Sequence, residues 1–370
     1  MIGTSMNTKT IRLIRPSINL VDVLPDFENI FSSGIFSSGN YNKEFRLKLK
    51  QFIGSNHISL TTSATTALWS CLKMLKIGKG DEVLISDFSF PATANVVEDL
   101  GAKPVLVDVN PDTFNSEASE IERLISKKTK AIIFVDALGN PSGVSKVSKL
   151  SKHYKIPLIE DAACSIGSSE NNINCGNIAD VTCFSFHPRK LICAGEGGAI
   201  STNNKNWKEW FDLKLAHGGK KSDGHFSEFK TFGYNFRLSE IQSAMSLIQI
   251  DNLKNLIKSR KEIFSFYKAE LNKFGFEEQK ISNSAKTNYQ TIAFKVPKIQ
   301  SRDQLIYFLK DHNIETTIGT YSISSIKYYN SKYKFNNINS RYLMNSSIAL
   351  PCYEGVDCER VVETIKRFLK

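Results

Sequence analysis

Long apolar segments are absent from this sequence of 370 residues. No stretch approaches the roughly 18 uninterrupted apolar residues that a membrane-spanning helix requires. Residues 1–16 are basic but lack the apolar core of an export signal. We therefore expect a cytoplasmic protein with no membrane partner. Glycine and proline are also scarce, at 21 and 10 residues, which excludes a collagen-like or disordered chain.

Cysteine pairs and metal-ligand spacings are missing as well. The seven Cys are odd in number, contain no CxxC pair and are accompanied by only six scattered His. A disulfide framework or a zinc site depends on such pairs. We therefore predict free thiols and no metal site.

The charge is one-sided but not clustered. Lys and Arg number 48 against 37 Asp and Glu, a net charge of +11. Nucleic-acid-binding proteins gather basic residues on one face and carry a recognition motif. Here the basic residues are spread along the chain among acids, without such a motif. The sequence predicts no nucleic-acid partner, and a basic surface that favours an acidic small substrate such as a nucleotide diphosphate.

The first half of the chain alternates short apolar runs with helical segments. The runs predict buried parallel strands at residues 58–60, 82–85, 104–107, 131–135 and 157–160. The segments between them predict helices at 66–75, 93–100, 120–126 and 144–153. This alternation predicts an α/β fold, a mostly parallel sheet flanked by helices.

The pattern changes after residue 238. Apolar residues at helical spacing predict one long helix over 239–274, which links two domains. A strand at 289–296 and helices at 302–311 and 358–369 follow. We expect a large domain over residues 1–250 and a smaller C-terminal α+β domain over 251–370.

Ligands of parallel sheets collect at the carboxyl ends of the strands. Residues 61–66, TTSATT, follow a predicted strand and begin a helix. The backbone N–H groups of this turn are a candidate phosphate site, and the alternative is that Thr62 or Ser63 only caps the helix. Asp161 ends another predicted strand. It is a candidate either for a helix cap or for a partner of a cationic ring nitrogen.

Two further segments carry candidate chemistry. Lys190 lies in a run that continues into a Gly-rich turn, where a partly desolvated lysine acts as an amine nucleophile, although a lone lysine is usually on the surface. Residues 233–237, GYNFR, precede the long helix and are otherwise read as a turn that caps it.

Together these segments resemble the fold type I pyridoxal-phosphate enzymes and, more narrowly, the DegT/StrS group of sugar-nucleotide aminotransferases. The resemblance runs from about Ser33 to the C-terminus, and the order and spacing of its motifs are more specific than any one of them. The matching segments are GKGDEV at 78–83, FSFPATA at 88–94, GAKPV at 101–105, EDAA at 160–163, SFHPRK at 185–190, GEGG at 195–198, GYNFR at 233–237 and ALPCY at 349–353.

The resemblance implies a role for each matching residue. Lys190 would bind pyridoxal 5'-phosphate covalently and shuttle the substrate proton. Asp161 would pair with the pyridine nitrogen, and Phe90 would stack on the ring. The phosphate-binding residues would be Ala64, through its backbone, Thr65 and Ser185. Asn235 would reach the cofactor phosphate of the neighbouring subunit in a homodimer with shared active sites, and His217 would lie near the substrate.

The chain departs from the family pattern at three positions. Ala64 stands where Gly is usual, a change that is tolerated if its φ is negative. Cys164 stands where Gln, His or Glu is common and leaves open the hydrogen bond to the cofactor hydroxyl. Asp136 replaces a frequent His. These departures affect the identity of the substrate more than the class of chemistry.

The implied function is transfer of an amino group, with glutamate as the expected donor, to a nucleotide-linked keto-sugar for surface polysaccharide or related amino-sugar biosynthesis. One alternative is a pyridoxal- or pyridoxamine-phosphate sugar dehydratase, in which His replaces the lysine, so Lys190 argues against it. A non-catalytic pyridoxal-phosphate-binding regulator would carry a DNA-binding segment, and neither end shows one. A nicotinamide oxidoreductase would carry a GxGxxG motif after its first strand. Arg189 and Arg237 are candidates of similar weight for binding the carboxylate of the donor, and backbone amides are the alternative.

Overall fold

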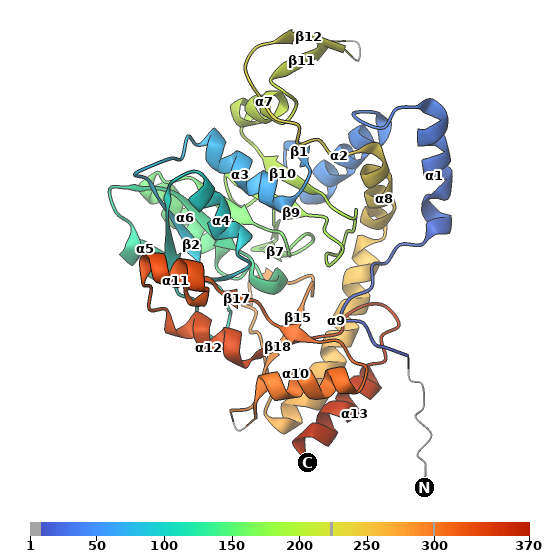
Figure 1. The fold of residues 1–370 in the computed structure, drawn as a ribbon, viewed down its shortest axis with the longest axis vertical. Coiled ribbons are helices and arrows are strands. Elements are labelled where there is room, and N and C mark those ends of the chain that lie inside the picture. Colours follow the sequence, from blue (N-terminus) through green and yellow to red (C-terminus); the bar gives the residue numbers. More distant parts are fainter. Residues whose placement is uncertain (1–8, 223–224, 299) are drawn as a thin grey trace.

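A computed structural model describes residues 9–222, 225–298 and 300–370 (Figure 1). Residues 1–8 belong to the segment 1–16 that was predicted to lack an export signal, and they lie outside the described residues. The largest sheet has seven strands in the order β1-β10-β9-β6-β5-β2-β4. Their bounds are β1 His57–Thr61, β10 Gly198–Thr202, β9 Val181–Ser185, β6 Leu158–Asp161, β5 Thr129–Val135, β2 Glu82–Ser86 and β4 Lys103–Val107.

The predicted mostly parallel sheet is confirmed, with one correction. Strands β4, β2, β5, β6 and β9 pair in parallel. The run at 58–60 is a buried strand but not a parallel-paired one, because β1 pairs antiparallel with β10, which is also antiparallel to β9. An apolar run shows burial on both faces and not which strand will lie beside it. Since β10 alone is reversed, β1 still ends at the same edge as β6 and β9.

Helices cover both faces of this sheet, as predicted. Side chains alternate along β2, so Val83 and Ile85 pack with α3 and α4, whereas Leu84 packs with α5 and α6. The strands are therefore apolar on both faces. The helices are α3 Ala64–Met74, α4 Ala92–Asp99, α5 Ala118–Leu124, α6 Val144–Tyr154 and α7 Lys205–Lys214.

The long helix predicted over 239–274 is in fact two helices, α8 Glu240–Asp251 and α9 Leu253–Leu271, interrupted at Asn252. Ser239 begins α8 with a capping box, in which its hydroxyl accepts from Gln242 N and its own N–H donates to the Gln242 side chain. Figure 1 shows α8 and α9 running from the large sheet to the second sheet. The apolar repeat continues across Asn252, and for that reason the sequence did not reveal the break.

The second sheet has four antiparallel strands in the order β13-β15-β18-β16. Helices α9, α10 and α13 contribute to its core, which includes Tyr267, Phe294, Leu305 and Ile365. The predicted strand at 289–296 and both predicted helices are confirmed. The bounds are β13 Glu277–Glu278, β15 Ile292–Lys295, β16 Thr317–Ile318, β18 Ser347–Leu350, α10 Arg302–Asp311 and α13 Cys358–Leu369.

The remaining elements lie around these two sheets. In Figure 1 the hairpin β11–β12 projects from the top of the molecule, and α1 lies at the right side of the molecule. Within the part of the chain that the structure describes, no helix has the length and apolar character needed to cross a membrane. The bounds are α1 Leu20–Ser33, α2 Asn40–Ile53, β3 Phe88–Ser89, β7 Ser169–Glu170, β8 Ile173–Asn174, β11 Gly219–Ser222, β12 His225–Phe229, β14 Ala285–Lys286, β17 Tyr321–Ser322, α11 Lys327–Tyr333 and α12 Ile338–Ser346.

Candidate functional site

The predicted site residues gather at the carboxyl edge of the large sheet. Asp161 ends β6, Ser185 ends β9, and Lys190 lies in the loop that leads from β9 to β10. Thr61 pairs with Gly198, which pairs in turn with Ser185, so the turn that opens α3 lies beside Ser185 across β10. The topology therefore brings the TTSATT turn and the SFHPRK segment together, although more than a hundred residues separate them in the sequence.

The first turn of α3 is both capped and open to a ligand. The Ser63 hydroxyl accepts from Thr66 N at 3.1 Å, and Ser63 N donates to Thr66 Oγ1 at 3.1 Å. Ala64 and Thr65 begin the helix, and their N–H groups have no acceptor within it. The capping and phosphate-binding interpretations are thus compatible. Ala64 lies in the helix and not at a positive φ, so its methyl group causes no strain.

Gly198 forms the floor of this turn. A Cβ built on it would lie 2.5 Å from the Ser63 carbonyl carbon and 2.7 Å from Ala64 N. Only glycine allows β10 to approach the start of α3 so closely. The GEGG pattern alone does not predict the role of Gly198, because its close contact with the turn depends on a strand pairing that the sequence does not show.

Asp161 is a buried carboxyl with few partners. Its side chain is 6% exposed, and it accepts from Thr93 Oγ1 at 3.0 Å and from Ala163 N at 3.2 Å. Burial raises the pKa of Asp161, while the two hydrogen bonds and the positive charge of Lys190 lower it. A further cationic partner would stabilise the ionised form. Thr93, in α4, is a contact that sequence reasoning missed.

Lys190 is half-buried and points at Cys164. Its Nζ donates to Cys164 Sγ at 3.0 Å, and its charge acts on Asp161. The side chain that departs from the family pattern is therefore in direct contact with the lysine. A pocket beside Lys190 is lined by residues of the N-terminal segment, α9 and the chain after β18: Arg15, Ser17, Ser259, Arg260 and Tyr353.

The Lys190 loop is held by two buried amide side chains. Gln290 accepts from Leu191 N at 2.8 Å and donates to the Arg189 carbonyl at 2.5 Å. Gln249, in α8, accepts from Cys193 N at 2.9 Å and donates to the Cys193 carbonyl at 2.7 Å. Gln290 thus binds backbone groups on either side of Lys190, and Gln249 binds both backbone groups of Cys193 further along the loop, which together fix the loop. Sequence reasoning missed both, because their partners lie far away in the chain.

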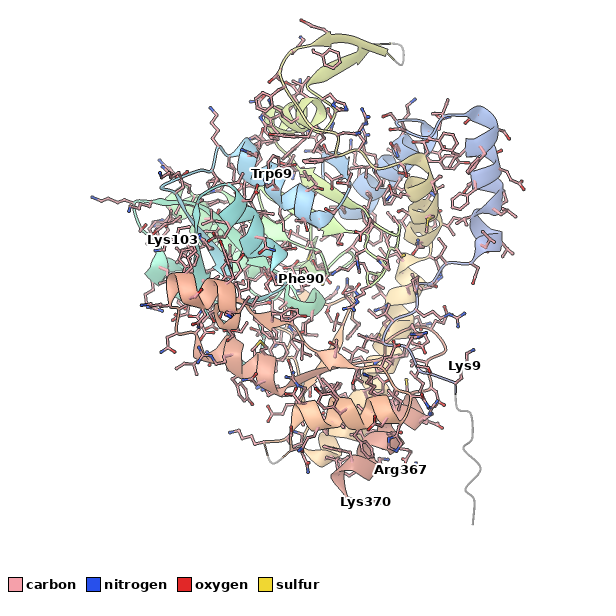
Figure 2. All side chains as sticks on the ribbon, viewed as in Figure 1. Lys9, Trp69, Phe90, Lys103, Arg367 and Lys370 are labelled. Carbon is pink, nitrogen blue, oxygen red and sulfur yellow. The ribbon has the colours of Figure 1, made fainter. Side chains whose placement is uncertain are left out.

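Phe90 is exposed in a way that suits a ligand. It follows β3 and is 64% exposed (labelled in Figure 2). The Tyr321 ring lies 6.1 Å from it in an edge-on arrangement, which leaves a face of Phe90 open. The pairing of β3 with β17 brings it to the segment 318–329.

Asn235 and His217 lie at the base of the β11–β12 hairpin, apart from the group around Asp161. Ala216 forms a β-bridge with Asn235, and His217 N donates to the Tyr234 carbonyl at 2.8 Å. Both side chains are exposed. The loop 217–232 includes residues 223–224, which lie outside the described residues.

The chain is similar to known proteins over nearly its whole length. The model of the DegT/DnrJ/EryC1/StrS aminotransferase family matches residues 21–368. A GDP-perosamine synthase of Escherichia coli O157:H7 is 31% identical over 92% of this chain and 93% of its own length. The spore coat polysaccharide biosynthesis protein SpsC of Bacillus subtilis is 26% identical over 91% and 92%. The solved structure of Helicobacter pylori PseC, an aminotransferase of pseudoaminic acid biosynthesis, has a TM-score of 0.90 at 26% identity, covering 98% and 99%.

Proposed function

Because the chain belongs to the DegT/DnrJ/EryC1/StrS aminotransferase family, we propose that it transfers an amino group from glutamate to a nucleotide-linked keto-sugar, using pyridoxal phosphate. The observation that carries this proposal is the convergence of Asp161, Lys190, Ser185 and the first turn of α3 at one edge of the sheet. An amine, a carboxyl and a phosphate-binding turn are the groups that this cofactor requires. The family match agrees with the resemblance drawn from the sequence.

The residues present fit the cofactor. When bound, pyridoxal phosphate supplies the electron sink for the carbanion chemistry of amino transfer. Asp161 has accepting capacity left beyond Thr93 and Ala163, so it would keep a proton on the ring nitrogen. The open face of Phe90 would orient the ring. The Ala64 and Thr65 N–H groups, the positive end of the α3 dipole and the Ser185 hydroxyl would hold the phosphate.

Lys190 would perform the proton transfers. Its Nζ, which donates to Cys164 Sγ, would hold the cofactor and would act as the base that accepts a proton from the substrate carbon and later gives it back. Gln290 and Gln249 would keep the loop in place while Nζ moves between these positions. This division leaves the lysine side chain mobile on a fixed backbone, as repeated proton transfer requires.

The substrate class rests on charge and on the relatives. The chain carries a net charge of +11, which would attract a nucleotide diphosphate. The names of two relatives refer to a GDP-linked amino sugar and to a spore coat polysaccharide. We therefore place the reaction in the cytoplasm, in amino-sugar biosynthesis for a surface polysaccharide. His217 and the loops 217–232 and 318–329 would contact the sugar.

A homodimer with shared active sites would explain why Asn235 and His217 are exposed and lie apart from Asp161. Helix α1 buries Val23 and Ile30 against the rest of the chain, yet several apolar side chains of the helix and of the turn after it remain exposed. Such a surface is typical of a subunit interface. Asn235 would then reach the cofactor phosphate of the partner subunit. The exposed apolar residues are Leu20, Val21, Leu24, Phe31, Ile35 and Phe36.

Within each subunit we propose a domain boundary near residue 250.

The first experiment is an absorbance spectrum of the purified protein with pyridoxal phosphate, before and after excess glutamate. We expect a visible band that glutamate removes, and a borohydride-trapped adduct on Lys190 that is absent in Lys190→Ala. A band indifferent to glutamate would favour the non-catalytic regulator. A trapped adduct on another lysine would refute the assignment of Lys190. Release of water from the sugar without a new amine would favour the dehydratase.

A further inference from the structure

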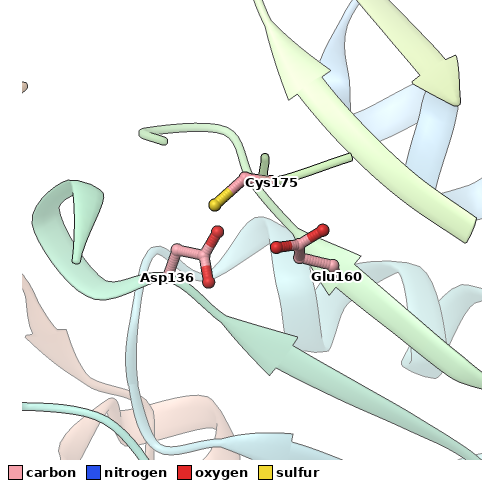
Figure 3. A group of neighbouring side chains, drawn as sticks. All are labelled: Asp136, Glu160 and Cys175. Atoms are coloured by element: carbon pink, nitrogen blue, oxygen red, sulfur yellow. The ribbon is translucent and has the colours of Figure 1, made fainter. Parts of the chain in front are cut away.

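Three side chains form a buried cluster next to Asp161, on the opposite face of β6. Asp136, Glu160 and Cys175 are 1%, 0% and 1% exposed, and their polar atoms lie within 4.8 Å of one another. Figure 3 shows the two carboxyl groups turned toward each other below the Cys175 sulfur. Glu160 precedes Asp161 in β6, and consecutive side chains of a strand point to opposite faces, so the cluster lies on the side away from the proposed cofactor.

The hydrogen bonds of the cluster are unequal. Glu160 Oε2 accepts from Gly176 N at 2.9 Å and from Thr182 Oγ1 at 2.7 Å. Asp136 Oδ2 accepts from Ser165 Oγ. The other two oxygens, Asp136 Oδ1 and Glu160 Oε1, are buried and have no hydrogen-bond partner among the described residues. Two ionised carboxylates with bare oxygens facing each other would be strongly disfavoured in a buried site.

A proton resolves this conflict, and the surroundings decide which residue carries it. Neither carboxyl forms an ion pair with a lysine, arginine or histidine of the described residues. Burial raises the pKa of Asp136 well above its usual value, and the charges of Glu160 and Asp161 raise it further, although hydrogen bonds from Ser165 and Cys175 lower it. Burial also raises the pKa of Glu160, but hydrogen bonds from Gly176, Thr182, Cys175 and Asp136 lower it. Glu160 is therefore the better anion of the two.

We propose that Asp136 is a positioning residue that stays protonated and donates a hydrogen bond from Oδ1 to Glu160 Oε1. This bond ties the end of β5 to β6, where Asp136 N also donates to the Asp161 carbonyl at 3.2 Å. It leaves one negative charge behind Asp161 instead of two. Asp161 then meets a weaker opposing field and can ionise when a cationic partner binds, a consequence that rests on the proposed function.

Infrared spectroscopy of the cofactor-free protein at neutral pH tests the proton directly. We expect the carbonyl stretch of a protonated carboxylic acid in the wild type and its loss in Asp136→Asn, whose amide donates to Glu160 in place of the acid. Glu160→Gln should also remove the band, because its amide donor faces Asp136 and drives that carboxyl to ionise. This second variant keeps the test decisive if Asp136→Asn does not fold.

Glu170→Gln is the matched control. Glu170 is equally buried but accepts from Gly143 N and Ser145 N, both at 2.7 Å, so it is satisfied as an anion and its replacement should leave the band in place. A carboxylic-acid band of unchanged intensity in both Asp136→Asn and Glu160→Gln would overturn the proposal. Stoichiometric metal in the purified protein, measured by atomic emission, would also overturn it, since a cation would then occupy the space of the proton.

The pH dependence of the loaded enzyme separates positioning from simple structural support. In the wild type, loss of the Asp136 proton on the alkaline side adds a charge beside Asp161, Glu160 and Cys175, and so shifts the absorbance of bound pyridoxal phosphate. Asp136→Asn cannot lose that proton, so we expect one alkaline transition fewer. An unchanged alkaline profile would overturn the link to Asp161. The infrared result requires no activity, so failure of the proposed function would not be mistaken for failure of the acid pair.

Discussion

The candidate site has an enclosed half and an exposed half, and they differ in how they are built. Asp161 and Ser185 are buried, and Lys190 is partly so, each within a network that one chain completes. Phe90, His217 and Asn235 are exposed at the rim. In the proposed function the enclosed half would hold the cofactor, whereas the exposed half has surface available for a substrate or a second subunit. Variants of the two halves should therefore fail in different ways.

Mixing two inactive variants is the strongest way to test that division. Lys190→Ala should lower turnover by at least about 10²–10⁴-fold, because it removes the general base. Asn235→Ala should weaken cofactor binding by about 10–100-fold through one charged hydrogen bond. If sites are shared, a mixed dimer holds one intact site, so an equal mixture should recover roughly a quarter of wild-type activity at limiting cofactor. No recovery after subunit exchange would place Asn235 and Lys190 of one chain in the same site.

Asp161→Asn should give the next largest effect, confined to chemistry in the enclosed half. The amide cannot keep the ring nitrogen protonated, so we expect a loss of about 10²–10³-fold in turnover. The folded state should persist, because Thr93 and Ala163 retain an acceptor. Stopped-flow absorbance after glutamate addition measures the half-reaction, with Glu170→Gln as the control for loss of a buried carboxylate. Wild-type rates in Asp161→Asn would exclude its role.

Gly198→Ala should affect cofactor binding more than turnover. Its methyl group would press on Ser63 and Ala64 and displace the first turn of α3. Overpacking of this kind costs about 1–3 kcal/mol, and we expect most of it to appear as a higher dissociation constant for pyridoxal phosphate. Gly195→Ala is a contrasting variant, because its φ of 80° causes backbone strain while no atom lies within 4 Å of the added Cβ. Equal losses of affinity in both variants would argue against a steric effect on the phosphate turn.

Asp136→Asn should produce the smallest effect, visible as a change in the pH dependence of stability. The folded pKa of Asp136 is raised above the unfolded value, so its contribution is fully present below the unfolded pKa and is lost as the pH rises toward the folded pKa. The wild type should therefore lose about 1.4 kcal/mol per pH unit relative to Asp136→Asn across that window. Urea unfolding at several pH values measures the difference. Parallel curves would show that Asp136 carries no extra proton in the folded state.

Much of the enclosed half follows from local patterns. Asp161 and Ser185 end apolar runs, and Ser63 begins an amphipathic helix, so their places at the carboxyl edge could be predicted. Gly198, Gln249 and Gln290 could not, because each acts on a segment to which only the folded chain brings it. The contact between Lys190 and Cys164 belongs to the same group. Asp136 was noticed as a departure from a family pattern, but its unpaired oxygen is a property of the packed interior.

The sequence by itself determined the α/β class, five of the seven strands of the large sheet, the approximate bounds of six helices and the aminotransferase family. The six helices are α3, α4, α5, α6, α10 and α13. These properties depend on local hydrophobic periodicity and on motifs whose order survives without coordinates. Only the tertiary structure decided that β10 is reversed between β1 and β9, that the long helix breaks at Asn252, and that Asp136 faces Glu160. The physical reason is that strand pairing and buried electrostatics depend on which distant residues become neighbours, and a one-dimensional pattern does not contain that information.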